Sequence, residues 1–107
     1  MRILLDENIP KRLKFDFPVD DEVRTVQELN WQGKKNGELL GLITFAGFDL
    51  FITLDKNLRF QQNLERFSIQ IIILDALDSR YITLQPLIIK VTRTLSKKLS
   101  GQITIIS

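Results

Sequence analysis

Two polar segments with the same spacing follow apolar runs of the sequence, and together they could bind a metal ion. Asp6 opens an Asp-Glu-Asn segment directly after residues 3–5, and Asp55 opens an Asp-Lys-Asn segment directly after residues 50–54. Carboxylates that are brought together repel each other, and a divalent cation usually relieves that repulsion. Such an ion could activate water and stabilise the transition state of phosphodiester hydrolysis. The two segments therefore predict a metal-dependent hydrolytic site.

The composition restricts the chemistry further. The 107 residues contain no Cys and no His, which excludes Ser-His-Asp and Cys-His mechanisms and zinc sites built from thiolates or imidazoles. A bound metal must then have oxygen ligands, which favours Mg²⁺, Mn²⁺ or Ca²⁺. Fifteen Lys and Arg against thirteen Asp and Glu leave a net charge of +2, which is a weak indication of a nucleic-acid partner.

A simpler role is open for each of these acids. An Asp after a strand commonly caps the following helix, and Asp6 and Asp55 could each do no more than that. The repetition of Asp-x-Asn after two buried strands favours a shared site instead. Asp75 follows another apolar run and could join them, or it could start a turn with Asp78 and Ser79.

Five apolar runs predict the strands that must position these residues. Three of the runs are continuous rather than alternating, which is typical of strands buried on both faces of a parallel sheet. The predicted strands are Ile3–Leu5, a weaker Glu22–Val26, Leu50–Leu54, Ile69–Leu74 and Ile103–Ile106.

Helical patterns occupy the intervals between the strands. The first begins with Pro10, which suits a first helical turn, with Asn8 as the expected cap. The last carries an apolar stripe from Leu84 to Leu99. The predicted helices are Pro10–Phe15, Asn36–Phe45, Leu58–Phe67 and Ile82–Leu99.

Strands that alternate with helices predict a three-layer α/β/α sandwich with right-handed crossovers and a mostly parallel central sheet of four to five strands. Residues 1–107 form one domain, because no repeat or linker interrupts them. Ligands of open parallel sheets bind beyond the carboxyl ends of the strands, so we expect Asp6 and Asp55 to face one cleft.

The sequence also bears on the location of the protein. The segment Met1–Asp6 reaches a charge too early for a signal peptide. No apolar run nears the roughly 18 residues of a membrane span. We therefore expect a cytoplasmic protein with no membrane partner.

Three stretches of the sequence, LLDENIPKRL, TVQELNWQGKKNGELL and GFDLFITLDKNLRFQQNL, resemble the PIN-like proteins of unknown function that are associated with toxin–antitoxin modules. The resemblance covers nearly the whole chain in order. The Asp-Glu-Asn opening and the Thr-x-Asp-Lys-Asn segment are its more specific parts. It implies a PIN-like fold, and in active PIN domains four acidic positions bind a divalent metal for ribonuclease chemistry.

The resemblance assigns these acidic positions residue by residue. Asp6 matches the first acid, Glu28 the acid that opens the next helical segment, and Asp55 the late acid. These three are therefore the candidate catalytic residues and ligands of Mg²⁺ or Mn²⁺. Asn57 stands where relatives often carry a second Asp. Glu28 could instead be a solvent-facing helix residue.

The remaining acidic position departs from the family pattern. It usually opens the helix predicted at 36–45 in a pattern like Asp-x-Glu, where this sequence has Asn36 and Glu38. Asn keeps an oxygen ligand but loses a charge, and the charge count sets much of the affinity for a hard cation. Glu38 could compensate in the cleft, or it could be a first-turn charge that the helix macrodipole favours.

Basic residues flank these acids in the sequence and could position phosphates, although a solvated surface is the simpler interpretation of each. The candidate nucleic-acid contacts are Lys11, Arg12, Lys34, Lys35, Lys56 and Arg59. Trp31 could stack on a base, while packing under its loop is the more ordinary role.

Three functions fit these residues. The first is hydrolysis of RNA with Mg²⁺ or Mn²⁺ by the toxin half of a toxin–antitoxin pair, with an antitoxin protein and a second copy of the chain as partners that the resemblance implies. The second is a catalytically weak or inactive PIN-like module that binds RNA or protein, which Asn36 and Asn57 favour. The third is phosphoryl transfer at Asp55, as in receiver domains, but the expected Lys does not follow the fourth apolar run.

Overall fold

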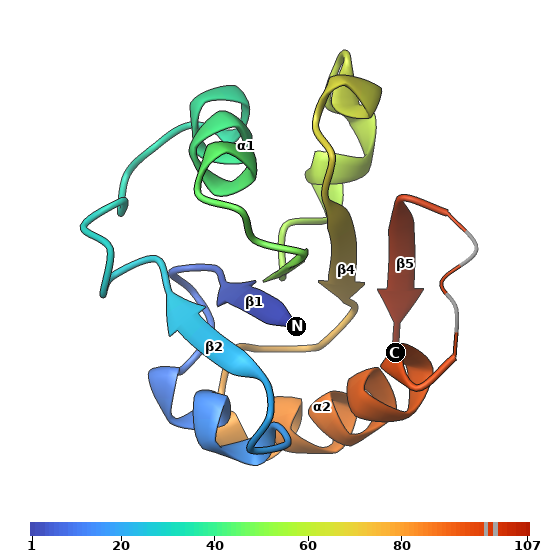
Figure 1. The fold of residues 1–107 in the computed structure, drawn as a ribbon. Coiled ribbons are helices and arrows are strands. Elements are labelled where there is room, and N and C mark those ends of the chain that lie inside the picture. Colours follow the sequence, from blue (N-terminus) through green and yellow to red (C-terminus); the bar gives the residue numbers. More distant parts are fainter. Residues whose placement is uncertain (98, 100) are drawn as a thin grey trace.

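The central sheet has five parallel strands, and it lies between helical segments in Figure 1. The structure is a computed structural model that describes residues 1–97, 99 and 101–107. The strands are β1 (Arg2–Leu5), β2 (Glu22–Thr25), β3 (Leu50–Thr53), β4 (Gln70–Leu74) and β5 (Ile103–Ile106). They lie in the order β2-β1-β3-β4-β5, and all neighbours are parallel. The predicted α/β fold is therefore confirmed.

Two α-helices and three 3₁₀ segments connect the strands in the described part of the chain. They are α1 (Asn36–Phe45), α2 (Tyr81–Leu95), η1 (Lys11–Asp16), η2 (Lys56–Phe60) and η3 (Leu64–Arg66). Among the residues that the structure describes, none of these helices has the length and apolar character that crossing a membrane requires.

The helical segments differ from the prediction in three places. The continuous helix expected over 58–67 is wrong, because Asn63 adopts a left-handed conformation (φ 58°) and separates η2 from η3. Asn tolerates that conformation better than most residues. The cap position of η1 is Pro10 and not Asn8, and no side chain caps this segment. The last helix ends at Leu95, earlier than predicted.

Helical segments cover both faces of the sheet, so the protein is a three-layer sandwich (Figure 1). On one face, here called the α2 face, η1 and α2 pack against the strands through buried residues such as Leu13 and Leu84. On the other, here called the α1 face, α1, η2 and η3 pack through buried residues such as Leu40 and Leu64. Each face of the sheet therefore has its own apolar core.

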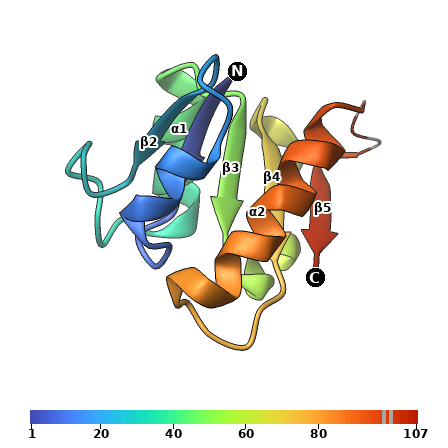
Figure 2. The same ribbon diagram turned by 90° about the horizontal axis from the view of Figure 1, so that it is seen from below.

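The connection from β4 to β5 has the opposite hand to the other three. Both η1 and α2 cover the α2 face, but β1 to β2 runs one way along the sheet and β4 to β5 runs the other way (Figure 2). The prediction of right-handed crossovers is therefore wrong for this connection. On that face α2 adds buried residues such as Leu84 and Val91 beside Leu13 of the six-residue η1.

The sheet order reverses between β1 and β3, at the centre of the sheet. The chain moves outward from β1 to β2 and returns to β3 on the other side of β1. Leu5, the last residue of β1, pairs with Thr25 of β2 and with Ile52 of β3. The three strands therefore end at one edge, and the segments after them start close together. Doubly wound folds bind ligands at such a reversal, although a fold alone does not define a function.

Candidate functional site

Asp6 is held against the end of β3 by hydrogen bonds from its backbone and its side chain. Its backbone N–H continues the ladder to β3 at 2.9 Å. Its Oδ2 accepts from the Thr53 hydroxyl at 2.6 Å, and its Oδ1 accepts from the Glu7 N–H at 2.8 Å. Asp6 and Thr53 belong to the α1 face, because Leu4 and Phe51, two residues before them, pack there. The carboxylate is therefore fixed in position.

Asp55 is linked to Asp6 through the same hydroxyl. The Asp55 N–H donates to Thr53 Oγ1 at 3.0 Å. Its Oδ1 accepts from the Asn57 N–H at 2.9 Å and caps η2, so the capping role that the sequence left open for Asp55 is confirmed. The charge of Asp55 also raises the pKa of Asp6. The two acids predicted to share a site are thus close enough to interact.

The pKa of Asp6 lies above its ordinary value of 3.8. Burial is the largest cause, and the negative charges of Glu7 and Asp55 act in the same direction. The hydrogen bonds from Thr53 and from the Glu7 backbone lower the pKa, but they offset only part of the effect. Burial and like charges disfavour the ionised form of a carboxyl group, and a nearby cation favours it.

Glu28 follows β2 at the same edge, but its side chain turns toward η1. Its Oε1 accepts from Lys14 Nζ at 2.7 Å and from the Thr25 N–H at 3.1 Å. Its Oε2 lies 3.6 Å from Arg24 Nη1. Partial burial raises the pKa of Glu28, but Lys14, Thr25 and Arg24 together hold it below its ordinary value of 4.5. Glu28 therefore already has cationic partners, and it lies in a turn rather than a helix.

The other predicted ligands are placed less centrally. Glu38 is exposed in the first turn of α1 and lies 3.8 Å from Lys34 Nζ. Asn57 is exposed and contributes its backbone N–H to the cap of η2. The side chain of Asn36 lies outside the described part of the structure.

Two acids, rather than three or four, are brought together. Among the described residues, no three acidic side chains form a group that could hold a metal ion. Asp75 does not add a third, because its Oδ1 lies 2.6 Å from Lys56 Nζ. Asp6 and Asp55 remain as the pair that the strand ends bring together.

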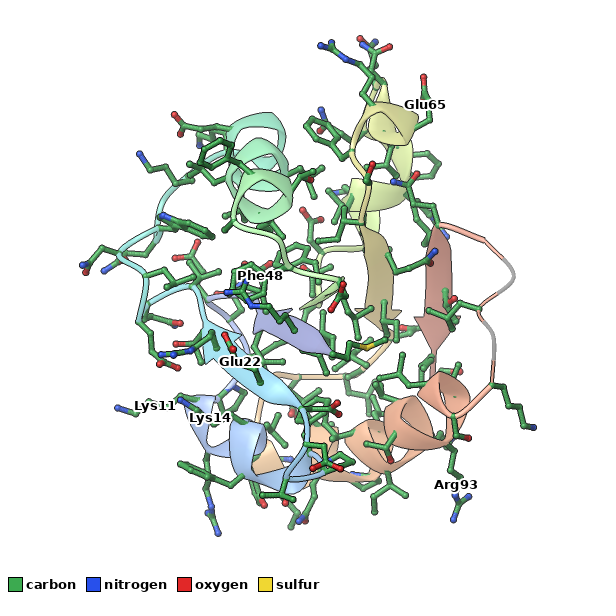
Figure 3. The ribbon with its side chains drawn as sticks, viewed as in Figure 1. Lys11, Lys14, Glu22, Phe48, Glu65 and Arg93 are labelled. Atoms are coloured by element: carbon green, nitrogen blue, oxygen red, sulfur yellow. The ribbon has the colours of Figure 1, made fainter. Side chains whose placement is uncertain are left out.

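The predicted basic residues are exposed, and four of them have a partner: Lys34 and Lys56 in ion pairs, and Arg12 and Arg59 over aromatic rings. Lys11 points into solvent beside Lys14 on η1 (Figure 3), and Lys35 is exposed just before α1. Two of the arginines lie over aromatic rings. The Arg12 guanidinium is 4.1 Å from the centre of the Tyr81 ring. The Arg59 guanidinium is 4.7 Å from the centre of the neighbouring Phe60 ring. These exposed cations could meet a polyanion without rearrangement of the core.

Thr53 is the residue that sequence reasoning missed. It was noted only as part of the Thr-x-Asp pattern, yet its fully buried hydroxyl joins the two acids. A lone polar residue inside the apolar run 50–54, two positions before an Asp, is the signal that could have identified it. Trp31 is half-buried edge-on to Phe48, with ring centroids 6.4 Å apart, so the prediction that it packs under its loop is confirmed.

The pair of acids fits Mg²⁺ or Mn²⁺ better than Ca²⁺. Ca²⁺ takes six to eight oxygen ligands, whereas Mg²⁺ keeps several waters and is commonly held by one or two carboxylates together with substrate phosphates. Burial and the charges of Glu7 and Asp55 raise the pKa of Asp6, and a pair of carboxylates matches the few protein ligands that Mg²⁺ commonly takes.

Comparison with known proteins produced no match, whether with family models, with curated proteins or with solved structures.

Proposed function

We propose that the protein is a PIN-like ribonuclease that depends on Mg²⁺ or Mn²⁺. One observation carries the proposal: Asp6 and Asp55 follow adjacent parallel strands, share the Thr53 hydroxyl and interact through their charges. The resemblance to PIN-like proteins supplies the reaction class. The two coupled carboxylates supply the reason for a cation to bind.

Each residue of the site has a stated role in this proposal. Asp6 and Asp55 hold the cation, and the side-chain oxygen of Asn57 completes its protein ligands. The ion, when bound, supplies Lewis-acid stabilisation of the negative charge on the phosphate. The Thr53 hydroxyl orients the Asp6 carboxylate at 2.6 Å. Glu28 is left out of this ligand set, because it would have to give up its contacts with Lys14 and Arg24.

The substrate's phosphates would meet positive groups at the same edge. The chain leaves β2 at this edge and returns along α1 to the start of β3, so α1 begins here and on the face of Asp6. The N-terminal end of a helix favours anions, and Lys34 and Lys35 directly precede it. The same proposal has the protein acting in the cytoplasm. An antitoxin partner, a toxin role and a homodimer follow from the resemblance alone.

A second candidate is a PIN-like module that binds RNA or protein without cleaving RNA. The arrangement of Glu28 favours it, because this acid is paired with Lys14 and Arg24 instead of facing Asp6. The described residues also contain no group of three acids suited to a metal ion. A site with two carboxylates binds a cation more weakly than one with four.

Titration with Mn²⁺ and cleavage of single-stranded RNA separate the two candidates. The wild-type protein should show saturable Mn²⁺ binding and cleavage that chelation abolishes. Asp6→Asn should reduce both, with cleavage falling at least about 100-fold, because loss of a metal-orienting neighbour alone costs roughly 10- to 100-fold. Asp20→Asn is the matched control, since Asp20 is exposed in the loop before β2.

The outcomes are distinct. Saturable Mn²⁺ binding and cleavage that Asp6→Asn abolishes and Asp20→Asn retains would sustain the nuclease. RNA binding without cleavage at any Mn²⁺ concentration would reject it in favour of the second candidate. Equal activity of Asp6→Asn and wild type would remove Asp6 from the site.

A further inference from the structure

A pocket of about 390 Å³ opens between η1 and the turn after β2. Its size lies within the range of roughly 300–1,000 Å³ that is typical of ligand pockets. Apolar atoms form most of its walls, although most of the lining residues are charged. The reason is that the methylene groups of these long side chains face the pocket. The lining residues are Lys11, Arg12, Lys14, Phe15 and Glu28.

Phe15 gives this pocket an aromatic wall. The residue is 80% exposed, although aromatic side chains are usually buried in the core of a small domain. Lys14 Nζ lies 5.9 Å from the centre of the Phe15 ring. The same ammonium group forms the ion pair with Glu28 at 2.7 Å. A hydrogen-bond donor and an acceptor therefore lie side by side next to a flat apolar surface.

The rim of the pocket is positively charged. Three basic residues and one acid line it, which leaves a net charge of +2. Arg12 is held in place, because its guanidinium stacks on Tyr81 and the Tyr81 hydroxyl donates to Asp16 at 2.8 Å. A cation whose position is fixed in this way loses less conformational entropy when it binds an anion.

The pocket adjoins the edge that carries Asp6. Glu28, which lines the pocket, follows β2, and Asp6 follows the neighbouring strand β1. Gln27 joins the two segments, since its Nε2 donates to the Glu7 carbonyl oxygen at 2.6 Å. An RNA chain bound at Asp6 would reach this pocket by crossing the sheet edge between the segments that follow β1 and β2.

We propose that this pocket holds one nucleobase of the RNA whose backbone passes Asp6, an inference that rests on the proposed ribonuclease function. The base stacks on Phe15, and its polar edge meets the paired Lys14 and Glu28. The adjoining phosphate lies against Lys11 and Arg12. Nucleic acid alternates flat bases with phosphates, and this alternation matches an aromatic wall beside a cationic rim. An acidic peptide would match the rim but would leave the aromatic wall without a partner.

The test is binding of a fluorescent single-stranded oligoribonucleotide in EDTA, so that cleavage cannot interfere. Phe15→Ala should weaken binding about tenfold, which is typical of the loss of one base–aromatic stack. Phe45→Ala is the matched control, because Phe45 is 94% exposed at the other end of α1, and it should bind like wild type. The melting temperature of both variants should be unchanged, since neither ring belongs to a core.

A set of oligonucleotides, each with a single abasic residue, makes the test specific. Wild type should lose about tenfold in affinity at one position, and Phe15→Ala should be insensitive there. Binding of inorganic polyphosphate should be the same for Phe15→Ala and wild type, because it lacks bases.

Three results would overturn the inference: equal RNA binding by Phe15→Ala and wild type, an equal loss with polyphosphate, or no RNA binding at all. A parallel cleavage assay with Mn²⁺ keeps the two proposals apart. Base-dependent binding without cleavage would sustain the pocket and reject the nuclease. If Phe15→Ala instead cleaves and binds RNA like wild type, the nuclease is sustained and the base pocket is rejected.

Discussion

Asp6 and Glu28 follow neighbouring parallel strands at the same edge of the sheet, but their surroundings act on their charges in opposite directions. Burial and like charges raise the pKa of Asp6. The partners of Glu28, Lys14 first among them, outweigh its partial burial and lower its pKa. Within the described residues, no Lys or Arg forms an ion pair with Asp6, whereas two do with Glu28. The Asp6 carboxylate is therefore a candidate ligand for a cation under the proposed function, whereas Glu28 already has cationic partners.

The alternation of side chains along the strands explains this difference. Asp6 continues the row of β1 that faces α1, next to Thr53 of β3. Glu28 folds back onto Thr25, whose hydroxyl accepts from the Glu28 N–H at 3.2 Å, and reaches Lys14 on the opposite face. Two acids that the resemblance assigns to one metal site are thus separated by the sheet edge itself.

The largest expected effect on stability comes from Thr53→Val, which removes the hydroxyl and keeps the side-chain volume. Asp6 loses a charge-assisted hydrogen bond, and the Asp55 N–H loses its acceptor. Hydrogen bonds to charged groups contribute about 1.5–3 kcal/mol, so we expect a loss of about 2 kcal/mol in the free energy of unfolding. Urea unfolding at pH 7 measures it.

Thr53→Ser is the matched control, because it keeps the hydroxyl and should lose much less stability than Thr53→Val. Thr53→Val as stable as wild type would show that the hydroxyl link between the two acids does not stabilise the fold.

The strand ends could be predicted from the sequence, and with them the meeting of Asp6 and Asp55. The predicted strands match the observed ones to within one residue at each end, because continuous apolar runs are a strong signal and parallel strands end at the same edge. Features that depend on the path of the chain in space could not be predicted in this way. The pair of Lys14 with Glu28 joins residues 14 positions apart, and no local pattern predicts such a contact.

The same limit applies to the helical layer. The 58–67 segment has the apolar spacing of a helix, but the left-handed Asn63 interrupts it. The hand of the last crossover follows from the face that α2 covers and from the place of β5 in the sheet, and both are properties of the arrangement in space. Local patterns predict the elements, but they do not predict how the elements are arranged.

A smaller effect on stability, with a distinctive pH dependence, is expected for Asp6→Asn. Because the folded pKa of Asp6 is raised, ionisation favours the unfolded state. This cost is absent at low pH, begins as the pH rises through the ordinary value of 3.8, and is complete above the folded pKa. The amide is uncharged and can still bond Thr53 and Glu7. The melting temperature of Asp6→Asn should therefore be higher than that of wild type at pH 7 and equal to it at pH 3.

Asp20→Asn serves as the control in these melting experiments, and its melting temperature should follow that of wild type across the pH range. A lower melting temperature of Asp6→Asn at pH 7 would contradict the view that the Asp6 charge is held at a cost.

The smallest effect on stability is expected for Glu28→Gln. This variant should be less stable than wild type at neutral pH, whereas Asp6→Asn should be more stable. The folded pKa of Glu28 is lowered, so its charge stabilises the fold above the ordinary value of 4.5, and this contribution is lost as the pH falls through the folded pKa. Exposed ion pairs contribute about 0.2–1 kcal/mol, so Glu28→Gln should lose about 0.5 kcal/mol in the free energy of unfolding at pH 7, and this loss should shrink as the pH falls through the folded pKa. Glu65→Gln, at an exposed residue of η3, should show no such loss. If Glu28→Gln were instead more stable than wild type at neutral pH, Glu28 would resemble Asp6 as an acid in need of a cation, and it would return to the metal site.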